Sequence, residues 1–107
     1  MRVFRTFEDA MGAPTDIATP SDTRYAVVLA AGVPKSVAVP AGATSVIFNA
    51  TAPFWVQYGA AAAVPAADNL GGGAPELSPA ARRLAGVASL GLVASEACVV
   101  SLSFFGG

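Results

Sequence analysis

The strand pattern that decides the fold lies near the C-terminus, in residues 97–104, ACVVSLSF. Apolar side chains occupy every second position from Cys98 to Phe104, and Ser101 and Ser103 lie between the last three of them. An alternation with a period of two puts the apolar side chains on one face, which is typical of a half-buried antiparallel strand. We therefore predict a strand here, with its apolar face in the core.

Similar runs, rich in β-branched and aromatic residues, recur outward from this stretch and are separated by turn residues such as Pro40 and Gly42. They predict strands over residues 24–30, 35–39, 44–50, 54–58 and 87–93. Six or seven short strands in one chain of 107 residues predict an all-β fold. We expect a single antiparallel β-sandwich, with the jelly roll as one arrangement of it.

Two segments interrupt this series. Residues 59–75 are rich in Ala and Gly and predict a long surface loop, with one short edge strand near residues 62–64. Residues 78–86 have two interpretations. Ser78 before Pro79, with Gly86 at the end, fits one or two helical turns, whereas the same residues also fit a short strand that begins at Arg82. We favour the extended form, because the flanking segments are strands.

The first 23 residues differ from the rest of the chain. They hold four of the seven acidic residues and show neither a helical nor an alternating period. We predict an extended N-terminal arm over residues 1–23 and a β-sandwich domain over residues 24–107. Phe4 and Phe7 are too apolar for a free tail, so we expect them to anchor the arm on an adjacent subunit or on the surface of another protein. The alternative is that the arm folds back over its own sandwich and covers an edge strand.

The composition argues against most kinds of chemistry. The chain has no His and one Cys, so Ser–His and Cys–His nucleophile pairs are excluded and a zinc site lacks ligands. The net charge of −1 provides no basic stripe for nucleic acid, and the apolar stretches are shorter than the roughly 18–20 residues of a membrane span. We predict a protein that is not an enzyme and binds no cofactor, no metal, no nucleic acid and no membrane.

The low charge also points to association. Charged residues make up 12% of the chain, about half of the ~25% in an ordinary soluble domain, and 54% of the residues are hydrophobic. A monomer of this composition exposes much apolar surface. We therefore expect part of the surface to be covered by copies of the chain or by another protein.

Trp55 is the residue on which two functions differ. It alternates with Phe54 and Val56, so it lies on the opposite face of its strand. The favoured interpretation places Trp55 in a subunit contact or in a second packed face. The alternative is a platform for a sugar ring, in a small carbohydrate- or receptor-binding module.

Several stretches resemble small virion proteins of tailed bacteriophages: residues 36–43 (SVAVPAGA), 46–48 (VIF), 54–59 (FWVQYG), 75–82 (PELSPAAR) and 97–105 (ACVVSLSFF). The resemblance implies a β-sandwich head-decoration or cement protein, with no catalytic motif, and makes the capsid surface the second candidate contact of the arm. On the same basis, the carbohydrate- or receptor-binding alternative would be a module of a phage tail or head fibre. Such a protein is made in the host bacterial cytoplasm and resides on the capsid surface of the virion. Its implied partners are the major capsid protein or another virion protein and its own copies, with a trimer expected because decoration often occupies threefold positions.

Overall fold

The computed structural model describes residues 1–8 and 14–107, with side chains for residues 1–6 and 18–107. The described part contains strands and loops and no helix. Its ten strands are β1 (Thr6–Glu8), β2 (Pro14–Ala18), β3 (Thr23–Leu29), β4 (Lys35–Ala38), β5 (Ala43–Ala50), β6 (Trp55–Tyr58), β7 (Glu76–Leu77), β8 (Ala81–Arg83), β9 (Ser89–Val93) and β10 (Cys98–Gly106).

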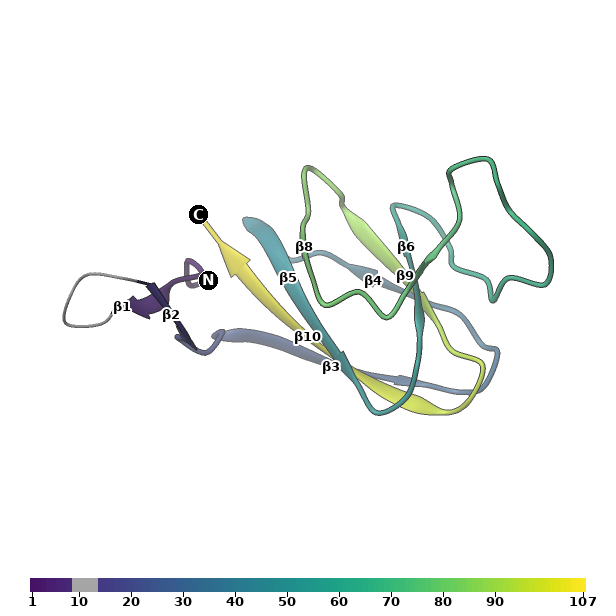
Figure 1. Ribbon diagram of the computed structural model, residues 1–107, viewed down its shortest axis with the longest axis horizontal. Helices are drawn as coiled ribbons and strands as arrows, with labels where there is room; N and C mark the ends of the chain where they lie inside the picture. Colours follow the sequence, from purple (N-terminus) through teal and green to yellow (C-terminus); the bar gives the residue numbers. More distant parts are fainter. Residues whose placement is uncertain (9–13) are drawn as a thin grey trace.

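Eight of the strands form two four-stranded antiparallel sheets that pack as a sandwich (Figure 1). The β10 sheet has the order β3-β10-β5-β8, and the β9 sheet has the order β4-β9-β6-β7. Counted from β3, one sheet thus holds the first, eighth, third and sixth strands and the other holds the second, seventh, fourth and fifth. This interleaved order is that of a jelly roll, so the all-β sandwich prediction is confirmed, including its jelly-roll form.

The core lies between the two sheets and follows the alternation predicted from the sequence. In β10 the side chains from Cys98 to Phe104 point inward at every second position and are buried, while Ser101 is exposed. The same alternation buries Val46 and Phe48 in β5. The remaining core side chains come from strands β3, β6 and β9 and from three loops: Leu29, Phe54, Val56, Leu84, Leu90, Leu92 and Ala94.

The expected strands are present with small shifts of their ends, and both undecided segments now have a definite structure. Residues 78–86 form no helical turn: they contain strand β8 at Ala81–Arg83, one residue earlier than the strand start we favoured, followed by a turn at Ala85 and Gly86. Ser78 explains the helix-like signal: it adopts a left-handed φ of 44° and exchanges hydrogen bonds with the backbone of Phe54. The prediction of an edge strand near residues 62–64 was wrong, because no strand lies between β6 and β7.

The segment after β6 instead crosses the outer face of the β9 sheet. A Cβ atom at Gly91 would overlap the carbonyl oxygen of Ala60 and lie 2.7 Å from the amide nitrogen of Ala62. Only glycine at position 91 allows this close approach of two backbones. Ala62 is buried as a result, and the Ala- and Gly-rich loop forms an outer cover over one sheet.

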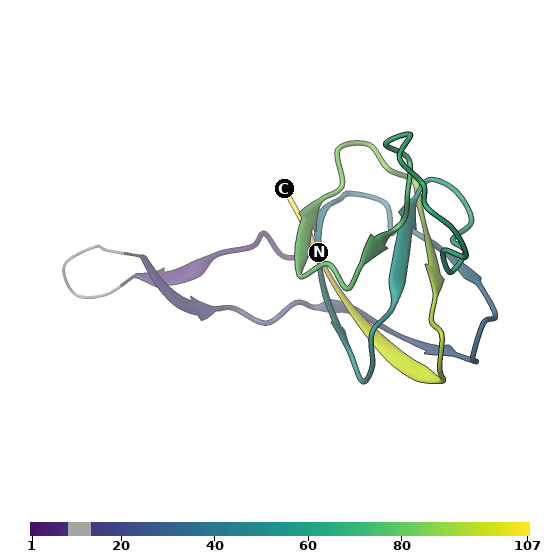
Figure 2. The ribbon, with the colours of Figure 1, turned by 45° about the vertical axis from the view of Figure 1, so that its right-hand side comes forward.

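The N-terminal arm contains a β-hairpin. Strands β1 and β2 pair with each other in antiparallel register and with no other strand. The hairpin projects from one end of the sandwich (Figures 1 and 2) and accounts for the elongated shape, with extents of 51 × 26 × 25 Å. The sandwich begins at Thr23, where β3 joins the β10 sheet.

Candidate assembly surface

The chain start is docked on the end of β10. Val3 forms a parallel β-bridge with Gly106, whose amide donates a hydrogen bond of 2.8 Å to the carbonyl of Arg2. The ring of Phe4 lies edge-on to Phe105, with the ring centroids 5.2 Å apart. This contact covers Phe105, which points away from the sandwich core but is only 3% exposed. The first residues of the arm therefore pack on their own domain.

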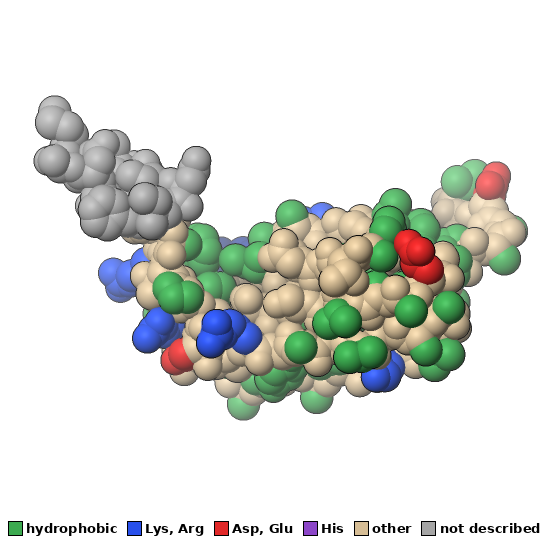
Figure 3. Space-filling view, turned by 90° about the horizontal axis from the view of Figure 1, so that it is seen from below, with side chains coloured by type: hydrophobic (Ala, Val, Ile, Leu, Met, Phe, Trp, Pro, Cys, Tyr) green, Lys and Arg blue, Asp and Glu red, His purple; other side chains and the backbone are tan. Residues whose placement is uncertain are grey.

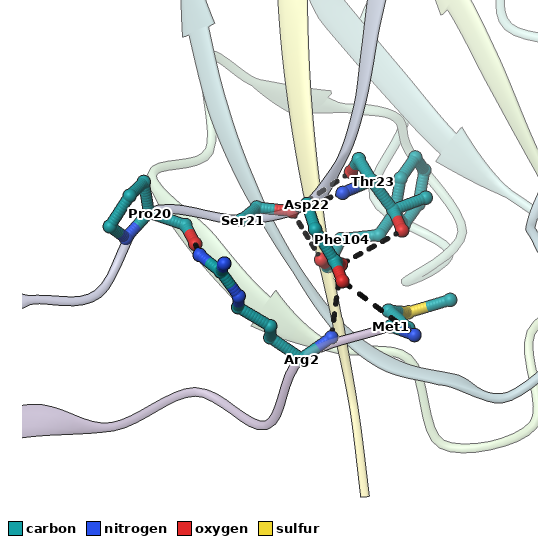
Figure 4. Close-up of polar contacts among 7 residues, drawn as sticks. All are labelled: Met1, Arg2, Pro20, Ser21, Asp22, Thr23 and Phe104. Atoms are coloured by element: carbon teal, nitrogen blue, oxygen red, sulfur yellow. Dashed lines mark hydrogen bonds and ion pairs between the residues drawn. The ribbon is translucent and has the colours of Figure 1, made fainter.

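The second leg of the arm is fixed beside the first (Figure 4). Ser21 is buried, and its hydroxyl donates to the carbonyl of Phe104 at 2.6 Å and accepts from the amide of Thr23 at 3.0 Å. The Asp22 carboxylate accepts from the Arg2 amide at 3.0 Å and lies 3.9 Å from the N-terminal ammonium group. The Arg2 amide is the main reason that the pKa of Asp22 lies below its ordinary value.

These contacts hold both legs of the hairpin at one end of the sandwich. The amide of Thr19 also donates to the carbonyl of Arg5, so the two legs stay together where they leave the domain. Residues 6–18, the segment that includes both strands of the hairpin, contain three acidic residues and no Lys or Arg, so all six basic residues lie outside this segment. Figure 3 shows basic side chains gathered near the base of the projection and hydrophobic side chains spread along the body.

A groove of about 410 Å³ lies beside the docked chain start. Val3 and Phe4 line one side of it, and Ile47, Arg82 and Arg83 of strands β5 and β8 line the other. Apolar side chains and Arg83 line this groove, whereas the Arg82 guanidinium is paired with the Glu76 carboxylate. Sequence inspection did not find this groove, because the residues that line it come from both ends and the middle of the chain.

The three residues predicted as assembly contacts do not lie together. Phe4 is 44% exposed and packs on Phe105 of its own domain. Phe7 lies in strand β1, and its side chain is outside the described residues. Trp55 is half-buried in the other sheet, in register with Leu77 on one side and Val93 on the other. Two exposed residues that the sequence analysis did not single out, Val28 and Val99, lie opposite each other on β3 and β10.

A polar bridge of Tyr58, Glu76 and Arg82 joins the two sheets at the β7 and β8 edges. The Arg82 guanidinium contacts both carboxylate oxygens of Glu76, the shortest contact being 2.8 Å, and the Tyr58 hydroxyl donates to the same carboxylate at 2.5 Å. Burial, followed by the hydrogen bond to Glu76, raises the pKa of Tyr58. The hydrogen bonds from Arg82 and then Tyr58 lower the pKa of Glu76 below 4.5.

This bridge predicts an acid-sensitive contribution to stability. Because the pKa of Glu76 is lower in the folded than in the unfolded chain, the bridge stabilises the fold at pH values above 4.5 and its contribution is lost as the pH falls through the folded pKa. Between about pH 6 and pH 3, the wild type should lose more free energy of unfolding than Glu76→Gln in urea titrations. Glu96→Gln, which leaves the bridge intact, should behave like the wild type. Equal losses in the wild type and Glu76→Gln would contradict this role.

The polar bridge is partly exposed to solvent. Both charged partners are about 40% exposed at the sheet edge, and an exposed ion pair contributes roughly 0–1 kcal/mol. Within residues 1–8 and 14–107, no group of three or more His, Cys, Asp or Glu residues could hold a metal ion. The same part of the chain has no helix long and apolar enough to cross a membrane.

The single cysteine has the surroundings expected for a packing residue. Cys98 is buried at the start of β10, where burial raises the pKa of its thiol. A raised pKa keeps the sulfur protonated and weakly nucleophilic at neutral pH.

Comparison with known proteins yields no relative: no family model, no curated protein and no solved structure matches this chain.

Proposed function

We propose that the chain is a non-enzymatic structural protein of a virion, a decoration or cement protein that binds the capsid lattice and its own copies. The observation that carries the proposal is the acidic hairpin, which projects from a jelly-roll domain and is held at its base by both legs. A two-stranded hairpin is marginally stable by itself in water, so it gains stability by packing against a partner.

The body of the protein supports the same role. Jelly rolls are frequent in viral capsid domains, although a fold by itself does not define a function. Large apolar side chains are exposed over the described surface, among them Val28, Val33, Leu70 and Leu77. A protein bound in many copies to a lattice covers such side chains, and the acidic hairpin provides a specific contact to a basic site on the major capsid protein.

The first test is whether the protein belongs to particles. Virus particles from a culture of the source organism are purified on a density gradient, and the protein is detected with a specific antibody. We expect it to band with the major capsid protein in a constant ratio. A protein that stays entirely in the soluble fraction would contradict a virion role.

Removal of the hairpin tests how the particle is bound. Residues 6–18 are replaced by a short Gly-containing turn, which Arg5 and Thr19 can accommodate because their backbones are hydrogen-bonded. The shortened protein should keep its fold and its docked chain start, while its cosedimentation with particles lacking the native protein should fall at least about tenfold. A matched control shortens the exposed loop at residues 66–72 and should bind as the wild type does. If the shortened protein binds particles as well as the wild type does, the proposed contact between the hairpin and the capsid is wrong.

A carbohydrate-binding module is the second candidate function, because jelly rolls also occur in lectins. Substitution of Trp55 distinguishes the two functions. The indole is half-buried beside Leu77 and Val93, so Trp55→Ala should lower the free energy of unfolding by about 1–2 kcal/mol. Chemical denaturation followed by circular dichroism measures this loss, with Leu77→Ala, at a side chain 54% exposed, as the milder control. An unchanged stability together with lost binding to a glycan array would favour the sugar-binding function.

A further inference from the structure

The four edge strands of the sandwich differ in how well they are protected against pairing with another chain. Strand β7 has two residues and β8 has three, two of which are arginines. Strand β4 has four residues and begins with Lys35, directly after Pro34. Short length, charge and proline are the usual protection of sheet edges. Strand β3 has seven residues, with one charged residue, Arg24, and no Pro, and its register with β10 is continuous over all seven pairs.

The free backbone groups of β3 follow from its pairing with β10. The amide of Val99 donates to the Thr51 hydroxyl, and its carbonyl accepts from the Thr51 amide, so both groups of Val99 point away from β3. Val28 is directly opposite Val99 and therefore belongs to a pair without hydrogen bonds. Since successive residues of a strand alternate, the amides and carbonyls of Arg24, Ala26 and Val28 all face the open side of β3.

Apart from Thr23 and Arg24, the side chains along this edge are apolar, and several of them are open to solvent. Val28 is 62% exposed, Tyr25 is 37% exposed, and the adjacent Val99 of β10 is 39% exposed. A long, regular and apolar edge with unpaired backbone groups is the arrangement that accepts an added strand.

We propose that β3 pairs with β3 of a second copy of this chain, antiparallel about a two-fold axis at Ala26. The pairing joins two β10 sheets into one continuous sheet across the dimer. Ala26 then faces Ala26 of the partner subunit, and Arg24 faces Val28 of the partner subunit. The inference goes beyond the proposed function and does not depend on it, because β3 would pair in the same way in a protein that does not bind a capsid.

The sequence of β3 is what favours a second copy as the occupant. Centred on Ala26, the strand is self-complementary: the one charged residue, Arg24, meets an apolar side chain, and all residues of the strand are paired. A centre at Arg24 would put two arginines opposite each other, and a centre at Val28 would leave the four residues from Thr23 to Ala26 beyond the partner strand. Like charges directly opposite each other are destabilising. A two-fold pair also closes on itself and leaves no further copy of this edge exposed, which favours a dimer over the trimer expected from the sequence.

Sedimentation of the isolated protein tests whether two copies pair through β3. We expect the wild type to sediment as a dimer at micromolar concentration. Ala26→Pro removes an amide that faces away from β10, so it should leave the sandwich folded while raising the dimer dissociation constant at least about tenfold. Val28→Lys, on an exposed side chain, should have the same effect without a backbone change. Val33→Lys, at a valine 51% exposed outside the edge, should remain dimeric.

A cysteine at the axis tests the register. Ala26→Cys should form a disulfide-linked dimer on mild oxidation, because opposed residues of a hydrogen-bonded pair have Cα atoms about 5.5 Å apart, within disulfide range. Ala41→Cys, in the exposed turn before β5, controls for random collision and should stay largely monomeric on a non-reducing gel. A monomeric wild type, or dimers that persist in Ala26→Pro and Val28→Lys, would overturn the proposal. Loss of assembly in these variants without a cross-link at position 26 would overturn the pairing of β3 with β3 about Ala26.

Discussion

Replacement of Phe104 by alanine should lower the free energy of unfolding by about 3–5 kcal/mol. Its ring is fully buried between the sheets and lies edge-on to Tyr25, with the ring centroids 5.1 Å apart. Alanine would leave a cavity that the flanking strands cannot close, because β10 is paired with β3 on one side and β5 on the other. Domains of this size have total stabilities of about 5–15 kcal/mol, so the variant loses a large part of its margin.

Urea denaturation measures this loss, with the fluorescence of the single tryptophan, Trp55, as the signal. Phe4→Ala is the matched control: the same substitution at a ring 44% exposed should cost about 1 kcal/mol. A loss below about 1 kcal/mol in Phe104→Ala would mean that the core repacks around the missing ring.

Replacement of Gly91 by valine should be the second most damaging change, with a loss of about 3 kcal/mol. Valine suits a strand by intrinsic preference, but at this position its Cβ would overlap the backbone of Ala60 and Ala62. Backbone cannot rotate away as a side chain can, so the loop over residues 59–75 has to lift off the β9 sheet. Ala62 would then become exposed.

Two measurements follow this change: chemical denaturation, and the rate of proteolytic cleavage within residues 59–75, which should increase. Gly73→Val is the control, because a Cβ at Gly73 meets no atom within 4 Å and its φ is not in the left-handed region. That variant should stay within about 0.5 kcal/mol of the wild type. If Gly91→Val matches this control, the loop does not rest on the sheet in solution.

Phe104 and Gly91 both lie where segments far apart in the sequence meet. A third such contact involves Ser21. The hydroxyl of Ser21 bonds to the carbonyl of Phe104, 83 residues further on, and this contact fixes the arm to the central strand of the β10 sheet. The sequence predicted Phe4 and Phe7 as the main anchors of the arm, on an adjacent subunit or a capsid surface. The contribution of Ser21 was missed, because a serine before a predicted strand has no distinguishing pattern.

The hairpin and the rejected edge strand show the same limit of local patterns. Strands β1 and β2 are short, and their register is irregular between Thr6 and Glu8, so no alternation of apolar residues indicates them. Residues 62–64 did look like a weak strand, yet their backbone lies across a sheet face rather than along a sheet edge. In both cases the contact to another segment decides the conformation, and intrinsic preference is too weak to oppose it.

The sequence by itself determined the class of structure and the direction of most side chains. Alternation over residues 44–50 and 98–104 identifies strands and their buried faces, because a strand places successive side chains on opposite sides whatever its neighbours are. Tertiary structure alone decided the jelly-roll strand order, the projection of the hairpin, the passage of the loop over Gly91 and the open edge of β3. These features depend on which distant segments meet, and the hydrogen bonds and close contacts that select those partners have no periodic signature along the chain.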